Sequence, residues 1–206
     1  MRKPNIAILG ATGVVGREIT KIIDELKIDF NEIKFLSSAK SAGSKIEFQG
    51  KAYTVEEAKP ESFDGVNIVL ASAGGTTSKL FAPEIVKRGG VLIDNSSAFR
   101  MEKDVPLVIA YVNDEDLRNH KGIVANPNCS TSQLMLVLKP LIDKITLYDY
   151  ISERALAKKE IKSIAKALNI ECDEFRALEK DKKYLVFGSF LLVENFVREN
   201  VETTKI

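Results

Sequence analysis

Of the two cysteines in this chain of 206 residues, one has surroundings suited to nucleophilic chemistry. Cys129 follows a break in the chain at Asn126–Asn128 and precedes a predicted helix over Ser130–Leu138. The positive end of a helix favours the reactive thiolate. Cys172 lies among acidic residues, which disfavour the thiolate, and we interpret it as structural. By composition alone a lone cysteine is more often a small buried hydrophobe, and that alternative stays open.

A glycine-rich turn, Gly10–Gly16, points to a second chemistry, the binding of phosphate groups. It lies between an apolar run, Ile6–Leu9, and an amphipathic stretch, Val14–Leu26. Glycine permits a tight turn and a close approach of the backbone, and a helix N-terminus presents free N–H groups to a pyrophosphate. In this context the motif predicts a dinucleotide site. A turn used only for packing is the less favoured alternative.

The end of the second predicted strand, Glu32–Ser38, distinguishes between the two nicotinamide dinucleotides. An NAD site usually carries Asp or Glu there, which accepts hydrogen bonds from the ribose hydroxyls. Residues 37–43 hold no carboxylate, but they include Ser38, Lys40 and Ser41. Hydroxyls and an ammonium group suit the dianionic 2′-phosphate of NADP. The alternative is a solvated polar loop.

Arg100 ends the segment Asp94–Arg100, which leaves another predicted strand at its C-terminal end. Open α/β sheets bind ligands at those ends, and a guanidinium can hold a phosphate or carboxylate in a two-pronged contact. A surface charge paired with Glu102 is an equally good interpretation. His120, the only histidine, lies in a polar turn, so we favour a solvated loop residue over a general base.

Strand and helix patterns alternate over the part of the chain that would position these residues. Short links between them predict an α/β fold: a Rossmann-type, mostly parallel sheet with helices on both faces. The remaining strand and helix signals lie at Asn67–Ser72, around 80–86 and at Val91–Asn95. We predict a nucleotide-binding domain over 1–141 and a short α/β tail unit over 142–206. The predicted tail elements are Ile145–Ile151, Ala155–Leu168, Tyr184–Ser189 and Leu191–Val197.

Bulk composition excludes several classes of protein. Lys+Arg of 30 against Asp+Glu of 29 give a formal net charge of +1, which sets up no field for nucleic acid or an anionic membrane. No apolar run approaches the roughly 18–20 residues that span a bilayer, and the N-terminus shows no signal segment. Two cysteines build neither a disulfide framework nor a four-ligand metal site. We expect a cytoplasmic protein without a metal.

Six motifs occur together and in order before residue 141. They are Gly10–Gly16, Ser37–Gly43, Ser72–Gly75, Asp94–Arg100, Val105–Val108 and Asn126–Thr131. From about Asn5 to Leu141 the chain therefore resembles the NADP-binding half of aspartate-semialdehyde dehydrogenase. The resemblance implies NADP-dependent interconversion of aspartate semialdehyde plus phosphate with aspartyl phosphate, through a cysteine thioester. In the biosynthetic direction this leads towards lysine, threonine and methionine.

The same resemblance implies roles for individual residues. Cys129 would be the nucleophile, and Arg100 and Asn128 would hold the phosphate. The cofactor would be lined by Gly10, Thr12, Gly13, Val14, Ser38, Lys40, Ser41, Gly74 and Gly75. Lys40 stands where the family often has Arg. This implies a weaker NADP contact, because the Lys ammonium is a single point charge whereas the Arg guanidinium can form two parallel hydrogen bonds to a phosphate. Ala110–Asn113 replaces the usual Pro-Glu-Val-Asn.

Beyond Leu141 the family's second-domain motifs are missing from the sequence: a glutamine, an acid/base histidine, a substrate-binding arginine and the dimer surface. The tail instead resembles the end of folylpolyglutamate/dihydrofolate synthase, at Tyr150–Ala155 and Leu185–Phe190, without its ATP-binding loop. We therefore weigh a slow enzyme, an NADP-binding module with little turnover, and a subunit that needs a separately encoded second half. A homo-oligomer is left open.

Iodoacetamide should alkylate Cys129 faster than Cys172, because a helix N-terminus favours the thiolate and acidic neighbours disfavour it. Mass spectrometry of peptides after brief labelling measures the two rates. A Cys129→Ala variant gives the rate of Cys172 alone. Equal rates at the two sulfurs would show that the nucleophile is wrongly assigned.

Overall fold

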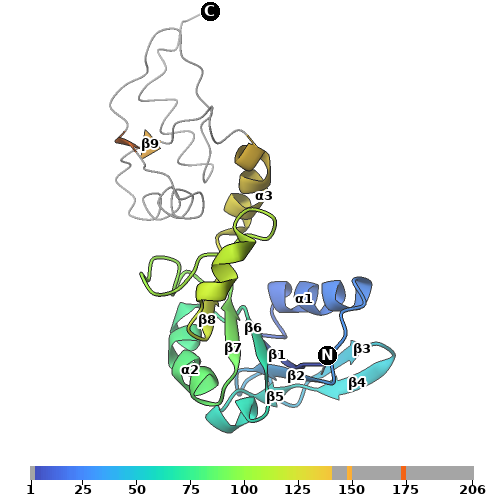
Figure 1. Cartoon of the computed structure of the whole chain (residues 1–206). Coiled ribbons are helices and arrows are strands. Elements are labelled where there is room, and N and C mark those ends of the chain that lie inside the picture. The colour runs from blue at the N-terminus through green and yellow to red at the C-terminus, as the bar shows by residue number, and fades with distance from the viewer. Residues whose placement is uncertain (1–2, 141–147, 150–172, 175–206) are drawn as a thin grey trace, which may run out of the picture. The chain divides into compact units, whose positions relative to one another are not determined.

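The computed structural model describes residues 3–140, 148–149 and 173–174 (Figure 1). The chain forms two compact units. One comprises Met1–Val108 and Glu115–Pro127, and the other comprises Ile109–Asp114 and the chain from Asn128 onward.

A six-stranded sheet forms the centre of the first unit, and its strands pair in parallel in the order β5-β2-β1-β6-β7-β8. The strands are β1 (Asn5–Leu9), β2 (Glu32–Ser37), β5 (Glu56–Glu57), β6 (Ile68–Ala71), β7 (Val91–Asp94) and β8 (Ile123–Ala125). This is the strand order of the doubly wound dinucleotide-binding sheet, in which the order reverses beside the first strand. The predicted Rossmann-type fold is confirmed.

Two helices cover opposite faces of this sheet, α1 (Val14–Glu25) and α2 (Gly75–Lys87). Successive residues of a strand point to opposite faces. Leu9 accordingly belongs to the apolar cluster that contains Ile85 of α2, whereas Ile8 belongs to the cluster that contains Ile23 of α1. The short strand β1 therefore contributes to both cores, which explains its continuous apolar run.

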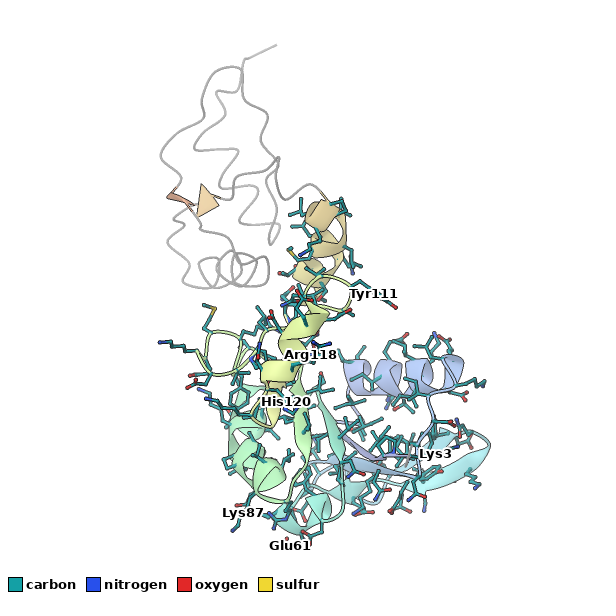
Figure 2. The ribbon with its side chains drawn as sticks, viewed as in Figure 1. Lys3, Glu61, Lys87, Tyr111, Arg118 and His120 are labelled. Atoms are coloured by element: carbon teal, nitrogen blue, oxygen red, sulfur yellow. The ribbon has the colours of Figure 1, made fainter. Side chains whose placement is uncertain are left out.

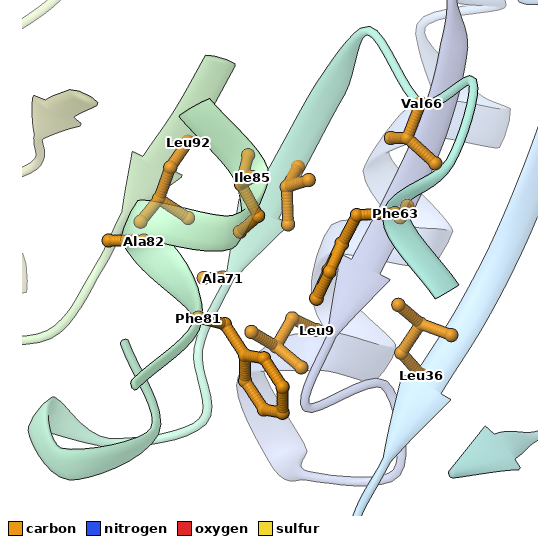
Figure 3. Close-up of a cluster of buried hydrophobic side chains, with 11 residues drawn as sticks. Leu9, Leu36, Phe63, Val66, Ala71, Phe81, Ala82, Ile85 and Leu92 are labelled. Carbon is orange, nitrogen blue, oxygen red and sulfur yellow. The ribbon is translucent and has the colours of Figure 1, made fainter. Parts of the chain in front are cut away.

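The core beneath α2 holds that helix against the sheet (Figure 3). Phe81, Ala82 and Ile85 of the helix pack with strand residues and with Phe63, and the rings of Phe63 and Phe81 have centroids 5.3 Å apart. Burying a large apolar side chain contributes roughly 1.5–3 kcal/mol. Charged side chains such as Lys87 lie on the outside of the unit (Figure 2).

An antiparallel hairpin that the sequence analysis did not predict follows β2. Its strands are β3 (Lys45–Phe48) and β4 (Lys51–Thr54), and Phe48 and Tyr53 pack in the cluster on the α1 side. The two turn residues, Gln49 and Gly50, both have positive φ, +50° and +71°. Such turns usually contain Asn-Gly or Asp-Gly, so Gln-Gly is a weak signal. The 3₁₀ helices are η1 (Pro60–Phe63) and η2 (Asp114–Asn119).

The second unit contains α3 (Cys129–Leu138), one residue longer than predicted, and two short strands that pair in parallel, β9 (Tyr148–Asp149) and β10 (Asp173–Glu174). The other predicted tail elements and Cys172 lie outside the described residues, and the boundary at residue 141 stays a prediction. Within the described part of the chain, none of the helices has the length and apolar character needed to cross a membrane.

Gly16→Ala should destabilise the first unit, because a Cβ there would lie 2.2 Å from the Gly10 carbonyl oxygen. Crowding of this kind costs about 1–3 kcal/mol, which exceeds the gain of about 1 kcal/mol from replacing glycine in a helix. Urea unfolding measures the change. Gly75→Ala is the matched control, since its Cβ would meet nothing closer than 3.7 Å. Equal unfolding midpoints for the two variants would refute the packing argument.

Candidate active site

The glycine turn lies between the ends of β2 and β6. Gly10 has φ +90°, and its amide donates to the carbonyl of Leu36 in β2 at 2.8 Å. A Cβ on Gly10 would lie 2.6 Å from the carbonyl oxygen of Ser72, just after β6. Only glycine fits this position. The turn therefore lies where the strand order reverses, which is where doubly wound sheets bind their ligands.

Helix α1 begins directly after this turn, with Gly13 as its N-cap residue and no capping side chain. The first N–H groups of a helix have no partner within it and attract anions. Val14, the first residue of the helix, is 88% exposed, and Gly13 is also exposed. The turn thus offers an open N-terminus for a phosphate group.

The polar turn after β2 is tied to the glycine turn by one hydrogen bond. The hydroxyls of Thr12 and Ser37 lie 2.8 Å apart, and Ser37 is buried. Beyond Ser37 the chain turns back, with the amide of Ser41 donating to the carbonyl of Ser38 at 2.9 Å. Lys40 is exposed on this turn. The structure therefore brings the predicted pyrophosphate and 2′-phosphate segments together.

Ser37 belongs to the sequence motif Ser37–Gly43, but only the structure shows its contact with Thr12. Its position as the last residue of the strand is the place where an NAD site usually has a carboxylate. The position of Ser37 at the end of a predicted strand is the sequence signal that could have identified it as a residue of the cofactor site.

The third predicted cofactor segment, Gly74–Gly75, caps and begins α2 on the other side of β1. Gly74 has φ +85° and is the N-cap residue of the helix. A Cβ on Gly75 would lie 3.7 Å from the Cβ of Ala98. Ala98 belongs to the loop that leads to Arg100, so the cofactor segment and the predicted phosphate segment are neighbours.

Arg100 is held by one backbone carbonyl of its own loop and one of the loop after β8. Its Nε donates to the carbonyl of Asn126 at 2.9 Å, and its Nη2 donates to the carbonyl of Asn95 at 3.0 Å. The side chains of these two asparagines are themselves joined by a 2.7 Å hydrogen bond. Arg100 is partly buried, so it is not a freely solvated surface charge.

Cys129 and Asn128 belong to the second unit. Cys129 is exposed and is the first residue of α3. The Asn128 side chain caps this helix: its Oδ1 accepts from the Ser130 amide at 3.0 Å, the Ser130 hydroxyl at 2.7 Å and the Cys129 thiol at 3.6 Å. The cap leaves the Nδ2 group of Asn128 as a donor for an anion. That both residues share a site with the glycine turn stays a prediction.

The segment that departs from the family pattern contains a residue in an unusual conformation. Tyr111 has φ +67° and is 87% exposed (Figure 2), and its amide donates to Asp114 Oδ1 at 2.8 Å. A left-handed residue other than glycine costs of order 1 kcal/mol and occurs often at functional segments.

His120 is exposed in the turn before β8, where its Nδ1 accepts from the Gly122 amide at 3.0 Å (Figure 2). Among the described residues, no group of three or more His, Cys, Asp or Glu side chains is arranged to hold a metal ion.

Comparison with known proteins assigns these features to a family. Residues 5–120 match the family described as "Semialdehyde dehydrogenase, NAD binding domain". The chain belongs to the semialdehyde dehydrogenase family. The matched range contains the glycine turn, the polar turn after β2 and the loop that carries Arg100.

Individual semialdehyde dehydrogenases align over a longer range. The aspartate-semialdehyde dehydrogenase of Aquifex aeolicus is 46% identical over 205 residues, which cover 94% of this chain and 60% of that protein. The crystal structure of aspartate semialdehyde dehydrogenase II from Vibrio cholerae, complexed with ASA, superimposes with a TM-score of 0.73 at 31% identity, over 86% of this chain and 69% of that one. The crystal structure of the Candida albicans aspartate semialdehyde dehydrogenase with NADP superimposes with a TM-score of 0.62 at 26% identity. The match covers 71% of this chain and 49% of that one.

The chain spans about half the length of several curated relatives that it matches, from 44% to 49% for those of Bacillus subtilis, Campylobacter jejuni and Synechocystis. The tail resemblance to folylpolyglutamate/dihydrofolate synthase is not supported. Instead, the Aquifex alignment covers 94% of this chain, and an alignment with the Prochlorococcus marinus dehydrogenase covers all of it.

Ser37→Ala should lower the free energy of unfolding by about 1 kcal/mol, because it leaves the partly buried Thr12 hydroxyl without its partner. Urea unfolding gives the value. The neighbouring variant Ser38→Ala is the control, since Ser38 is exposed and its loss should change stability by less than about 0.5 kcal/mol. A similar loss in both variants would mean that the hydrogen bond between the two turns contributes nothing.

Proposed function

We propose that this chain provides the NADP-binding and nucleophile-bearing part of an aspartate-semialdehyde dehydrogenase. The reaction converts aspartate semialdehyde and phosphate into aspartyl phosphate, or runs in the opposite direction. The observation that carries the proposal is the exposed thiol at the first residue of α3, directly after the last strand of a doubly wound sheet. The relatives named above, which are semialdehyde dehydrogenases, support the same activity.

The residues at the switch point fit a dinucleotide. The position of Gly10 excludes any Cβ, so a ligand can approach the backbone closely there. The open N-terminus of α1 would hold the pyrophosphate through its free amides. The glycine pair at the start of α2, Gly74 and Gly75, would line the other side of the cofactor. NADP, when bound, would supply the hydride acceptor for oxidation of the aldehyde carbon.

NADP is preferred over NAD because of the turn after β2. Ser38 and Lys40 are exposed there, Ser41 is partly exposed, and no carboxylate stands between residues 37 and 43. A carboxylate at this place would repel a 2′-phosphate, whereas hydroxyls and an ammonium attract it. The Candida relative whose structure contains NADP supports this choice.

Cys129 would act as the nucleophile. Its sulfur would form a bond to the aldehyde carbon of the substrate, and loss of a hydride from that carbon would leave a thioester on Cys129. An oxygen of phosphate would then attack the thioester carbonyl, and the sulfur would leave as the thiolate. The N-terminus of α3 favours this thiolate at both stages.

Arg100 and Asn128 would position the phosphate for that attack. The guanidinium is already held by two backbone carbonyls, through Nε and Nη2, so its orientation is fixed before an anion binds and little rotational freedom is lost on binding. Asn128 would contribute its amide Nδ2, since its Oδ1 caps the helix.

A phosphate-dependent assay of NADP reduction tests the function. With aspartate semialdehyde present, NADPH absorbance should rise only when phosphate is added, and Cys129→Ala should abolish the increase. The rate should be low unless the other half of the site is supplied, because a positioned acid/base contributes roughly 10²–10⁴-fold. Cys172→Ala, which removes the other cysteine and keeps the Cys129 thiol, is the matched control and should leave the rate unchanged.

Thermal unfolding with and without NADP separates the remaining outcomes. NADP should raise the melting temperature of both the native chain and Cys129→Ala, since binding to the folded state stabilises it. A shift without turnover would mean that the chain is a binding module or needs a second subunit. The absence of any shift would rule out the NADP site itself.

A further inference from the structure

Asp94 is the last residue of β7, and its side chain is completely buried, at 0% exposure. A buried carboxylate is costly unless several donors satisfy it. Asp94 has three: the Ser78 hydroxyl at 2.6 Å, the Ser96 hydroxyl at 2.6 Å and the Ser96 amide at 3.2 Å. Hydrogen bonds to a charged acceptor are stronger than neutral ones and fix geometry more sharply.

The donors come from two different segments of the predicted site. Ser78 lies in the first turn of α2, where its amide donates to the carbonyl of Gly74 at 3.0 Å. Ser96 lies in the loop that leads to Arg100, and its Oγ also accepts from the Ala98 amide at 3.1 Å. Asp94 therefore bridges the first turn of α2 and the start of the loop that leads to Arg100.

The two segments also lie side by side at Gly75, which has no side chain of its own. A Cβ on Gly75 would lie 3.7 Å from the Ala98 Cβ and 3.9 Å from the Ser96 Oγ. The first turn of α2 and the loop are therefore neighbours, and the Asp94 carboxylate joins them through hydrogen bonds.

Attachment of α2 to the sheet does not require a carboxylate. Phe81, Ala82 and Ile85 already bury the apolar face of the helix. An apolar residue at position 94 would avoid the cost of burying a charge, as replacement of buried ion pairs by apolar groups often shows. What the carboxylate adds is a defined orientation of Ser78 relative to Ser96.

We propose that Asp94 is a positioning residue that couples dinucleotide binding at the turn before α2 to the conformation of the loop carrying Arg100. Binding of the cofactor would restrict the motion of Gly74 and Gly75 at the start of α2. Because Ser78 and Ser96 both donate to the Asp94 carboxylate, the motion of Ser96 and its loop would then be restricted as well. The inference rests on the proposed function, because it takes NADP as the ligand of the first segment.

Hydrogen exchange followed by mass spectrometry tests the coupling. In the native chain, added NADP should slow exchange both in peptides that cover the glycine turn and in peptides that cover residues 95–100. Ser78→Ala removes one donor and leaves the two that Ser96 provides. In this variant NADP should still slow exchange at the glycine turn, while its effect on residues 95–100 falls about tenfold.

Two further variants sharpen the test. Asp94→Asn keeps the shape but replaces one acceptor oxygen by a donor, and should give the same loss in residues 95–100. Ser62→Ala is the matched control, since it removes a serine hydroxyl that donates to the backbone carbonyl of Glu57 and not to Asp94. In that variant NADP should slow hydrogen exchange in residues 95–100 as much as it does in the native chain.

The outcomes are separable from those of the proposed function. Equal NADP protection of residues 95–100 in the native chain and Ser78→Ala would overturn the coupling. Failure of NADP to slow exchange anywhere in the native chain would overturn the proposed cofactor. The ligand-free samples would then test whether Asp94 connects α2 to the loop. Faster exchange of residues 95–100 in ligand-free Ser78→Ala than in the ligand-free native chain would support that connection, and unchanged exchange would refute it.

Discussion

The close contact between Gly10 and the carbonyl of Ser72 is the constraint on which the other features depend. Because Gly10 has no side chain, the turn after β1 can lie directly between the ends of β2 and β6. Gly16 extends the same constraint to α1, which approaches the strand closely enough that a Cβ would clash with Gly10. The N-terminus of α1, the polar turn after β2 and the start of α2 all lie next to this contact.

Polar contacts at the carboxyl ends of the strands contrast with the apolar packing beneath them. From β2 to β8, neighbouring loops are joined in sequence by the hydroxyls of Thr12 and Ser37, by the carboxylate of Asp94 and by the guanidinium of Arg100. The apolar clusters on both faces fix the strands. The polar contacts orient the groups that would meet a ligand, since directional bonds fix angles that apolar contacts leave loose.

The sequence predicted those elements whose signal is local. The apolar run of β1, the periodicity of α1 and the glycine turn lie within about twenty residues, and all three were recognised. The hairpin after β2 was missed because Gln49 occupies a turn position where Asn or Asp is usual. The partners of Asp94 and Arg100 could not be predicted, because Ser78 is 16 residues away and Asn126 is 26 residues away. Such pairs become visible only when the strand order is known.

The path of the chain between β7 and β8 has a consequence for how the molecule is assembled. The chain leaves the first unit at Val108, returns at Glu115 and leaves again at Pro127, so the units are joined at three points rather than one. A single proteolytic cut after Pro127 would therefore leave Ile109–Asp114 of the second unit attached to the first. During synthesis, the sheet also lacks its sixth strand until residues 123–125 have emerged from the ribosome, so the edge of β7 is left unpaired until late in translation.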